Sequence, residues 1–210
     1  GVGVRHHRMD LCDRLLIHTK CESISLSLSL EYFNYSSFFF TMVNEQSFNN
    51  ALLIATKQED IEFVKYLVEQ CHADVNVKDE DNYKKAPLHI ATDKCNIGIV
   101  KYLVEKCHAD VNIKNKYRNT PLSIAAYSCN IDIVKYLVEK CHADIKTIGT
   151  IPIFNAIKKG DIEFVKYLIE QCHVDANIKN NLGRAPIYTA IEKCNIDIVK
   201  YLVGQCCANV

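Results

Sequence analysis

Cysteine and histidine stand next to each other four times in this chain of 210 residues. The phrase Val-Glu-Lys-Cys-His-Ala-Asp occupies 104–110 and again 138–144, and close variants occupy 68–74 and 169–175. Thiolate and imidazole groups are preferred ligands of zinc, and a cysteine beside a histidine base is a common nucleophile. The Cys–His pairs could therefore bind a metal ion or act as catalytic nucleophile and base.

The spacing of these pairs argues against both kinds of chemistry. Neighbouring residues on a helix point about 100° apart, so Cys71 and His72 are poorly placed to hold one ion together. Equivalent residues of adjacent repeats would lie about 8–10 Å apart, whereas zinc ligands lie about 2.0–2.3 Å from the metal. We therefore predict no metal, no cofactor and no catalytic residue. Each cysteine is expected to be a small buried apolar residue, and each histidine to meet unpaired carbonyls at a helix end.

The overall composition favours a cytoplasmic protein that does not bind nucleic acid. Lysine plus arginine number 25, and so do aspartate plus glutamate, which removes the usual electrostatic basis for binding nucleic acid or a membrane surface. The 11 cysteines are odd in number and sit in repeated phrases, which favours reduced thiols over a secreted disulfide scaffold. The apolar run 24–43 is interrupted by serines, Glu31 and Asn34, so we expect no membrane span.

A longer repeat surrounds each Cys–His pair. A phrase of the type Ile-x-x-Val-Lys-Tyr-Leu occurs five times, with its valine at positions 64, 100, 134, 165 and 199. A second phrase precedes it, as in Ala-Pro-Leu-His-Ile-Ala from Ala86 and Thr-Pro-Leu-Ser-Ile-Ala from Thr120. These phrases define a repeat domain over 42–210 with five units, which span 44–78, 79–114, 115–146, 147–179 and 180–210.

Each unit is predicted to contain two short helices. Apolar residues at spacings of three and four predict the second helix, and in the first unit these are Ile61, Val64, Leu67 and Val68. Acidic residues that suit the positive end of the helix dipole stand near its start, at Asp60, Asp132, Asp161 and Asp197. The first helix opens at a proline, a residue tolerated at the first helical position, at Pro87, Pro121, Pro152 and Pro186.

Three phrases in fixed order, Ala-Pro-Leu-His-Ile-Ala, Val-Lys-Tyr-Leu-Val-Glu and Ala-Asp-Val-Asn, resemble the ankyrin repeat. The tryptophan-containing pattern of the tetratricopeptide repeat, which has a similar length, is absent. The resemblance covers about four-fifths of the chain. It implies an all-α repeat solenoid of stacked helix–turn–helix units with β-hairpin-like loops. It also implies a non-enzymatic, monomeric module that binds another protein on a concave face.

The sequence departs from the family pattern at three places. The glycine usual between the two helices is kept only at Gly160 and is otherwise replaced by Glu59, Cys95, Cys129 or Cys194. The glycine that ends the second helix is replaced by histidine, with one residue added before it. The hairpin that begins at Lys146 is about three residues short. The stack is still expected, but the loop shapes at these places are left open.

Two further repeated positions have structural explanations. The family uses the histidine at His89 to brace the hairpin backbone, and its replacement by Ser123, Phe154 and Tyr188 argues against chemistry there. Five tyrosines recur in the second helices, at 66, 102, 136, 167 and 201. We predict that they pack between adjacent second helices, and a sticky outer surface is the alternative.

The resemblance places the partner-binding residues at the hairpin tips and at the ends of the first helices. The residue four before each proline is expected at a tip, which gives Tyr83, Tyr117, Ile148 and Leu182. Basic residues stand beside these tips at Lys84, Lys85, Arg118 and Arg184. The ends of the first helices add Asp93, Lys94, Tyr127, Lys158, Lys159 and Lys193. Such a face suits a protein partner with acidic groups around an apolar patch, and ordinary solvated turn residues are the alternative.

The first 41 residues do not show the repeat. Serine and leucine alternate at 23–30, a pattern that a CT dinucleotide tract would encode, and Met42 stands directly before the first unit. We expect 1–41 to be a disordered leader or a non-native translated segment.

A rival function is that of a regulatory or targeting fragment of a larger enzyme, channel or ubiquitin-ligase adaptor. The sequence stops at Val210, part-way through the Ala-Asp-Val-Asn phrase, and Gly204 lies inside the last predicted helix. Because a helical glycine costs about 1 kcal/mol relative to alanine, we expect the fifth unit to be the least stable.

Overall fold

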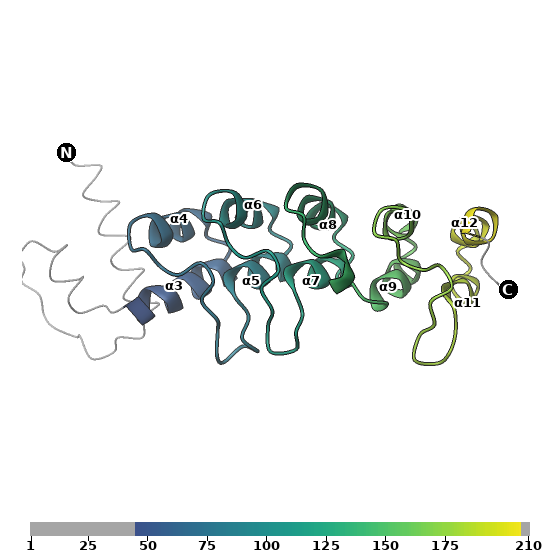
Figure 1. Cartoon of the computed structure of the whole chain (residues 1–210), viewed down its shortest axis with the longest axis horizontal. Coiled ribbons are helices and arrows are strands. Elements are labelled where there is room, and N and C mark those ends of the chain that lie inside the picture. The colour runs from purple at the N-terminus through teal and green to yellow at the C-terminus, as the bar shows by residue number, and fades with distance from the viewer. Residues whose placement is uncertain (1–44, 207–210) are drawn as a thin grey trace, which may run out of the picture. The chain divides into compact units, whose positions relative to one another are not determined.

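The fold is an all-α helical repeat. The computed structural model describes residues 45–206, and these residues form ten α-helices, one π-helix, one 3-10 helix and no β-strand. Figure 1 shows successive pairs, each made of a first and a second helix. The first helices are α3 (Glu45–Lys57), α5 (Pro87–Asp93), α7 (Pro121–Tyr127), α9 (Ile151–Lys159) and α11 (Pro186–Glu192). The second helices are α4 (Ile61–Glu69), α6 (Ile97–Glu105), α8 (Ile131–Lys135) with the π-helix Tyr136–Lys140, α10 (Ile162–Glu170) and α12 (Ile196–Cys206).

The described residues fall into two compact units, which lie on either side of a boundary between Asp110 and Val111. In the described part of the first unit, α3 packs on α4 and α5, and α5 packs on α6. In the second unit, α7 packs on α8 and α9, α9 on α10 and α11, and α11 on α12. Helix pairs of successive repeats therefore stack within each unit, as the sequence predicts. The segment 1–41, predicted to be a leader, lies outside the described residues.

Prolines and side-chain caps determine where the helices begin. Four first helices carry a proline at their first or second position: Pro87, Pro121, Pro152 and Pro186. Four second helices follow a cap whose side chain accepts a backbone N–H three residues on: Asp60, Asn96, Asn130 and Asp161. Such a cap contributes about 1 kcal/mol. The predicted acidic residues are thus caps at Asp60 and Asp161, and first-turn residues at Asp132 and Asp197.

A residue with left-handed backbone ends every first helix. These residues have φ between 54° and 74° and are Glu59, Cys95, Cys129, Gly160 and Cys194. The N–H of the next residue returns to a carbonyl five residues back, as from Asp60 to Ala55 over 3.1 Å. This Schellman arrangement favours glycine, because the left-handed conformation costs other residues about 1–2 kcal/mol. The glutamate and the three cysteines that replace glycine at this position therefore adopt the same turn as Gly160, at the cost of local backbone strain.

Candidate protein-interaction surface

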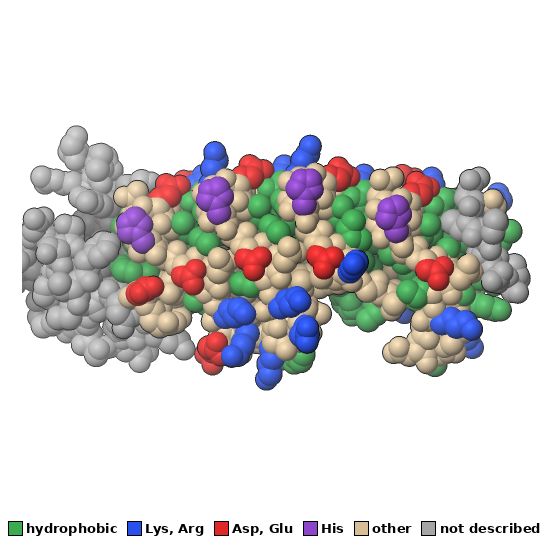
Figure 2. All heavy atoms as spheres, in the orientation of Figure 1, with side chains coloured by type: hydrophobic (Ala, Val, Ile, Leu, Met, Phe, Trp, Pro, Cys, Tyr) green, Lys and Arg blue, Asp and Glu red, His purple; other side chains and the backbone are tan. Residues whose placement is uncertain are grey.

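The Cys–His pairs lie just beyond the second helices. Their histidines have exposed side chains and left-handed backbones with φ of 53–55°, at His72, His108, His142 and His173. Figure 2 shows the imidazoles at the molecular surface. Histidine is among the few residues besides glycine that are enriched in this conformation, which explains its repeated use. Within residues 45–206, no group of three or more His, Cys, Asp or Glu side chains is arranged to hold a metal ion.

The prediction that these imidazoles meet the helix-end carbonyls is wrong. Backbone N–H groups meet them instead, since Ala73 donates to the Leu67 carbonyl over 3.0 Å and Ala109 donates to the Leu103 carbonyl over 2.9 Å. The donor here lies six residues after the acceptor, one more than at the ends of the first helices. The extra residue noted in the sequence therefore widens the last turn, which in the third repeat becomes the π-helix Tyr136–Lys140.

The cysteine before each of these histidines is at least half-buried. Cys71 and Cys172 are buried, as predicted, whereas Cys107 and Cys141 are half-buried. Burial, together with the nearby Glu139 carboxylate, raises the pKa of the Cys172 thiol to about 11. The thiolate is the reactive form of cysteine, so this side chain is a poor nucleophile at neutral pH. No disulfide joins the seven cysteines whose side chains the structure describes.

Tyrosines link three of the second helices to the second helix of the preceding repeat. The Tyr102 hydroxyl donates to the Glu69 carboxylate over 3.0 Å, and the Tyr167 hydroxyl donates to Glu139 over 3.1 Å. Tyr201 donates in the same way to Glu170 over 2.9 Å. Burial is the main cause that raises the pKa of the Tyr102 and Tyr167 phenols above the ordinary value. The predicted packing between adjacent second helices is confirmed for these three residues.

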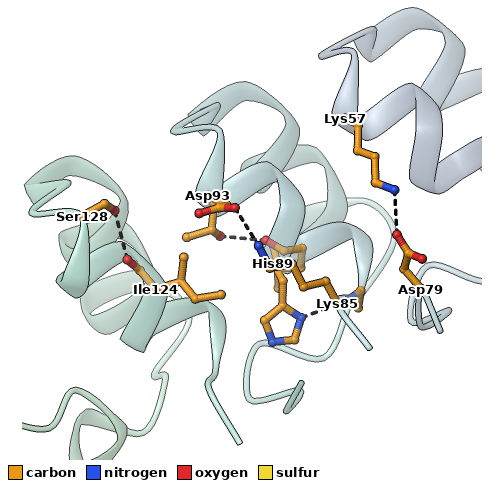
Figure 3. A network of polar contacts seen from close by, with 10 residues as sticks. Lys57, Asp79, Lys85, His89, Asp93, Ile124 and Ser128 are labelled. Atoms are coloured by element: carbon orange, nitrogen blue, oxygen red, sulfur yellow. Dashed lines mark hydrogen bonds and ion pairs between the residues drawn. The ribbon is translucent and has the colours of Figure 1, made fainter. Parts of the chain in front are cut away.

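His89 braces the backbone before α5. Its side chain is fully buried, and its Nδ1 accepts the Ala86 N–H over 3.1 Å (Figure 3). In the next repeat the Ser123 hydroxyl oxygen accepts the Thr120 N–H over 2.9 Å. The bracing role predicted for this position is thus confirmed in both repeats.

Four loops connect successive repeats. We number them loop 1 (75–86), loop 2 (111–120), loop 3 (145–150) and loop 4 (176–185). Loop 1 exposes Tyr83 and Lys84, both with left-handed backbone. Two of its three lysines are paired with acidic residues, Lys84 with Glu80 over 3.2 Å and Lys85 with Asp93 over 2.7 Å. Figure 3 shows the Lys85–Asp93 pair, and this pairing leaves loop 1 without a surplus of positive charge.

Loops 2 and 4 share one hairpin design. In loop 2 the buried Asn115 carboxamide accepts the backbone N–H groups of Tyr117 and Asn119 over 2.9 and 3.0 Å. In loop 4 Asn180 does the same for Leu182 and Arg184, over 2.9 and 3.1 Å. The side chains at the two tips point into solvent, with Tyr117 61% and Leu182 77% exposed. Both tips therefore lie where the sequence predicts.

Loop 3 has a different structure, and the prediction that Ile148 lies at an exposed tip is wrong. Its side chain is 4% exposed and follows the 3-10 helix Ile145–Thr147. Only seven residues separate Asp144 from Pro152, against ten between the equivalent residues that flank loop 2. The shorter chain cannot form the hairpin. The position four residues before Pro152 is therefore occupied by the buried Ile148 and not by a residue at an exposed tip.

The ends of the first helices carry the remaining predicted residues, all of them exposed: Asp93, Lys94, Tyr127, Lys158, Lys159 and Lys193. Lys159 donates to the Ser128 carbonyl over 2.7 Å and so braces the end of α7. On the first helices, sequence reasoning missed three exposed apolar residues, Ile151, Tyr188 and Ile191. The signal for Ile151 was present in the sequence, since it stands directly before Pro152 and beside the shortened loop.

The loops of the second unit carry charge of one sign. Loops 2, 3 and 4 contain six basic residues and no acidic residue, namely Lys114, Lys116, Arg118, Lys146, Lys179 and Arg184. All six side chains are exposed, and Arg184 pairs with Glu192 of α11. Loop 1, by contrast, contains three basic and three acidic residues. The positive strip predicted from sequence is therefore a feature of the second unit.

The geometry combines stacked helix pairs with exposed loops. A family model described as ankyrin repeats (3 copies) matches residues 6–115, 52–148 and 122–210. No curated protein matches the chain. Within the described part of the chain, no helix has both the length and the apolar character needed to cross a membrane. Because the family model accounts for most of the sequence, the chain belongs to the ankyrin repeat family, whose members in general are protein–protein interaction modules.

Proposed function

We propose that this chain is a cytoplasmic, monomeric and non-enzymatic module that binds a protein partner through loops 2 to 4 and the neighbouring ends of the first helices. The observation that carries the proposal is the composition of that edge, whose loops carry only basic charged residues and which bears exposed apolar side chains. Exposed apolar and aromatic residues are favourable interface anchors, because a partner that covers them removes apolar surface from water.

The partner's chemistry follows from that composition. Carboxylates on the partner complement Arg118 and Lys116 at the tip of loop 2, and an apolar side chain complements Tyr117 between them. Attraction between exposed charges is screened by salt, over a distance of about 8 Å at physiological ionic strength. The affinity should therefore fall as the salt concentration rises, mainly through slower association.

Binding by a defined partner tests the proposal. The full chain fused to a proximity-labelling enzyme identifies neighbouring proteins in cells, and the affinity of each purified candidate is then measured by calorimetry. In the test variant, Tyr117→Ala is combined with Arg118→Gly, which installs the residue that loop 4 has at the same place (Gly183, φ 74°) and keeps the turn. Both native side chains are exposed, so the melting temperature should not change, whereas affinity should fall about tenfold or more.

A charge-matched control is available on the second-helix side. Lys140→Ala removes one exposed positive charge from the π-helix and should leave the affinity unchanged. An equal loss for both variants would point to a general charge effect. Full affinity in the loop 2 variant would move the interface away from the loops.

A further inference from the structure

The row of hairpins in the second unit has a gap at loop 3. Loops 2 and 4 project from their helix pairs, while loop 3 runs level from the end of its repeat into α9 (Figure 1). Loop 3 instead forms a 3-10 helix in which the Thr147 hydroxyl donates to the Asp144 carbonyl over 2.7 Å. Thr120, directly before α7, donates to the same Thr147 hydroxyl over 2.9 Å, which holds this short loop against the preceding repeat.

The missing hairpin uncovers one apolar side chain. Ile151, directly before the proline of α9, is 55% exposed. The equivalent residues of the other repeats, Ala86, Thr120 and Ala185, are all buried. In Figure 2 the loop-bearing edge of the molecule recedes between the loop 2 and loop 4 projections. We name this feature, with Ile151 at its base and loops 2 and 4 at its sides, the loop-3 gap.

The size of the gap restricts what can enter it. Loops 2 and 4 are two repeat spacings apart, which is about 16–20 Å for helices packed at about 8–10 Å. A single α-helix with its side chains is about 10–12 Å wide. The missing hairpin frees one repeat spacing, about 8–10 Å. This is slightly less than the full width of a helix, so the gap receives the apolar face of one helix lying across the row of loops and excludes the flat surface of a folded domain.

The chemistry of the gap favours an acidic occupant. Every charged residue of its three loops is basic. Arg118 belongs to loop 2, Lys146 to loop 3 and Lys179 to loop 4, while the second basic residue of loop 4, Arg184, is paired with Glu192. Its exposed apolar groups are Ile151 and the tip residue Leu182. We propose that the loop-3 gap binds one amphipathic helix of a protein partner, with its apolar stripe on Ile151 and its carboxylates toward the flanking loops. This inference rests on the proposed protein-binding function and assigns it a place and a ligand shape.

Nucleic acid is the competing ligand for a basic edge. Phosphate groups are recognised by positive charge. They would make no favourable contact with the apolar Ile151 or with Leu182, which is 77% exposed at the tip of loop 4. The chain as a whole also has equal numbers of basic and acidic residues. The observations therefore favour the helix, and nucleic acid becomes an outcome of the test.

The experiment selects the ligand and then closes the gap. A display library of helical peptides, apolar at i, i+3, i+4 and i+7 and free in charge elsewhere, is selected against the full chain. In the loop-graft variant, residues 145–151 are replaced by the sequence of 176–185, which restores a standard hairpin at this place. A second variant, Ile151→Ser, leaves every loop length unchanged and alters a side chain that is already exposed, so it reports on the gap even if the graft fails to fold.

Acidic peptides should be enriched, and their affinity should fall about tenfold or more in both variants. The selected peptides could instead bind the graft, Ile151→Ser and native chains equally and lose affinity only in the Tyr117→Ala, Arg118→Gly variant. That result would refute binding in the loop-3 gap and leave the proposed function standing. The absence of any peptide or protein ligand would overturn both. Single-stranded or duplex nucleic acid that displaces the peptides from the native chain and binds more tightly would replace the helix as the occupant.

Discussion

Asparagine side chains join successive repeats, and their removal should have a measurable effect on stability. The Asn76 side-chain oxygen accepts the Asp110 N–H over 2.9 Å, and that of Asn112 accepts the Asp144 N–H over 3.0 Å. Each bond connects the Ala-Asp-Val-Asn phrase of one repeat to the equivalent segment of the next, which in the third repeat reads Ala-Asp-Ile-Lys. The third repeat has Lys146 at the equivalent position and offers no such acceptor.

Replacement of Asn76 or Asn112 by alanine should lower the free energy of unfolding by about 0.5–1.5 kcal/mol. The lower part of that range is expected, because both aspartate N–H groups belong to exposed residues and water replaces the lost acceptor. For a domain of this size, 1 kcal/mol corresponds to about 2–4 °C in melting temperature. Urea unfolding followed by circular dichroism should show a lower midpoint with an unchanged slope.

Lys146→Ala is the matched control, since it changes the same position of the repeat without removing such a hydrogen bond. It should leave the midpoint unchanged. The two asparagine bonds share no donor or acceptor, so their losses should add within about 0.5 kcal/mol. The reasoning would be refuted if neither asparagine variant lost stability, or if Lys146→Ala lost as much as they do.

Three further outcomes are expected. Cys95→Gly should raise the free energy of unfolding by up to about 1 kcal/mol, because the native φ of 58° strains any L-residue. The greater backbone entropy of glycine in the unfolded chain offsets only part of this gain. A lower urea midpoint would contradict the prediction. The pKa of the Tyr102 phenol is raised in the folded chain, so its contribution to stability is complete below about pH 10 and is lost as the pH rises further. Tyr102→Phe should therefore flatten the fall in unfolding free energy above that pH, and an unchanged slope would count against it. Iodoacetamide at pH 8 should modify the exposed Cys194 at least about a hundredfold faster than Cys172, which is buried and has a pKa of about 11. Equal rates by mass spectrometry would show that Cys172 is accessible.

The repeat itself could be predicted because the signals that define it are local. The prolines at the helix starts and the apolar spacing in each Val-Lys-Tyr-Leu phrase act over a few residues, and tertiary packing reinforces them. The histidine that replaces the helix-ending glycine keeps the left-handed conformation, as at His72, although the sequence left the loop shape there open. The side chain's role could not be inferred in the same way, because a backbone N–H already satisfies the carbonyl that was assigned to the imidazole.

The candidate surface was predicted less completely, for a reason that loop 3 illustrates. A register counted from the proline selects exposed residues where the loop is long enough to form a hairpin, as at Tyr117 and Leu182. At Ile148 the loop is three residues shorter and the register fails, so a buried residue was selected and the exposed Ile151 was missed. The pairing of Lys85 with Asp93 was also beyond sequence reasoning, because it joins side chains of a loop and a helix end.

Site-specific photo-crosslinking in cells tests the central claim most directly. A photo-reactive amino acid is placed at Leu182, the most exposed of the large apolar residues in the described chain, and at Lys140 on the second-helix side as a control. The proposed function predicts that the Leu182 chain forms a covalent adduct with one defined protein and that the Lys140 chain does not. Two results would contradict binding through the loops of the second unit. One is that adducts form only from the Lys140 position, and the other is that the Leu182 chain is fully expressed but forms no adduct.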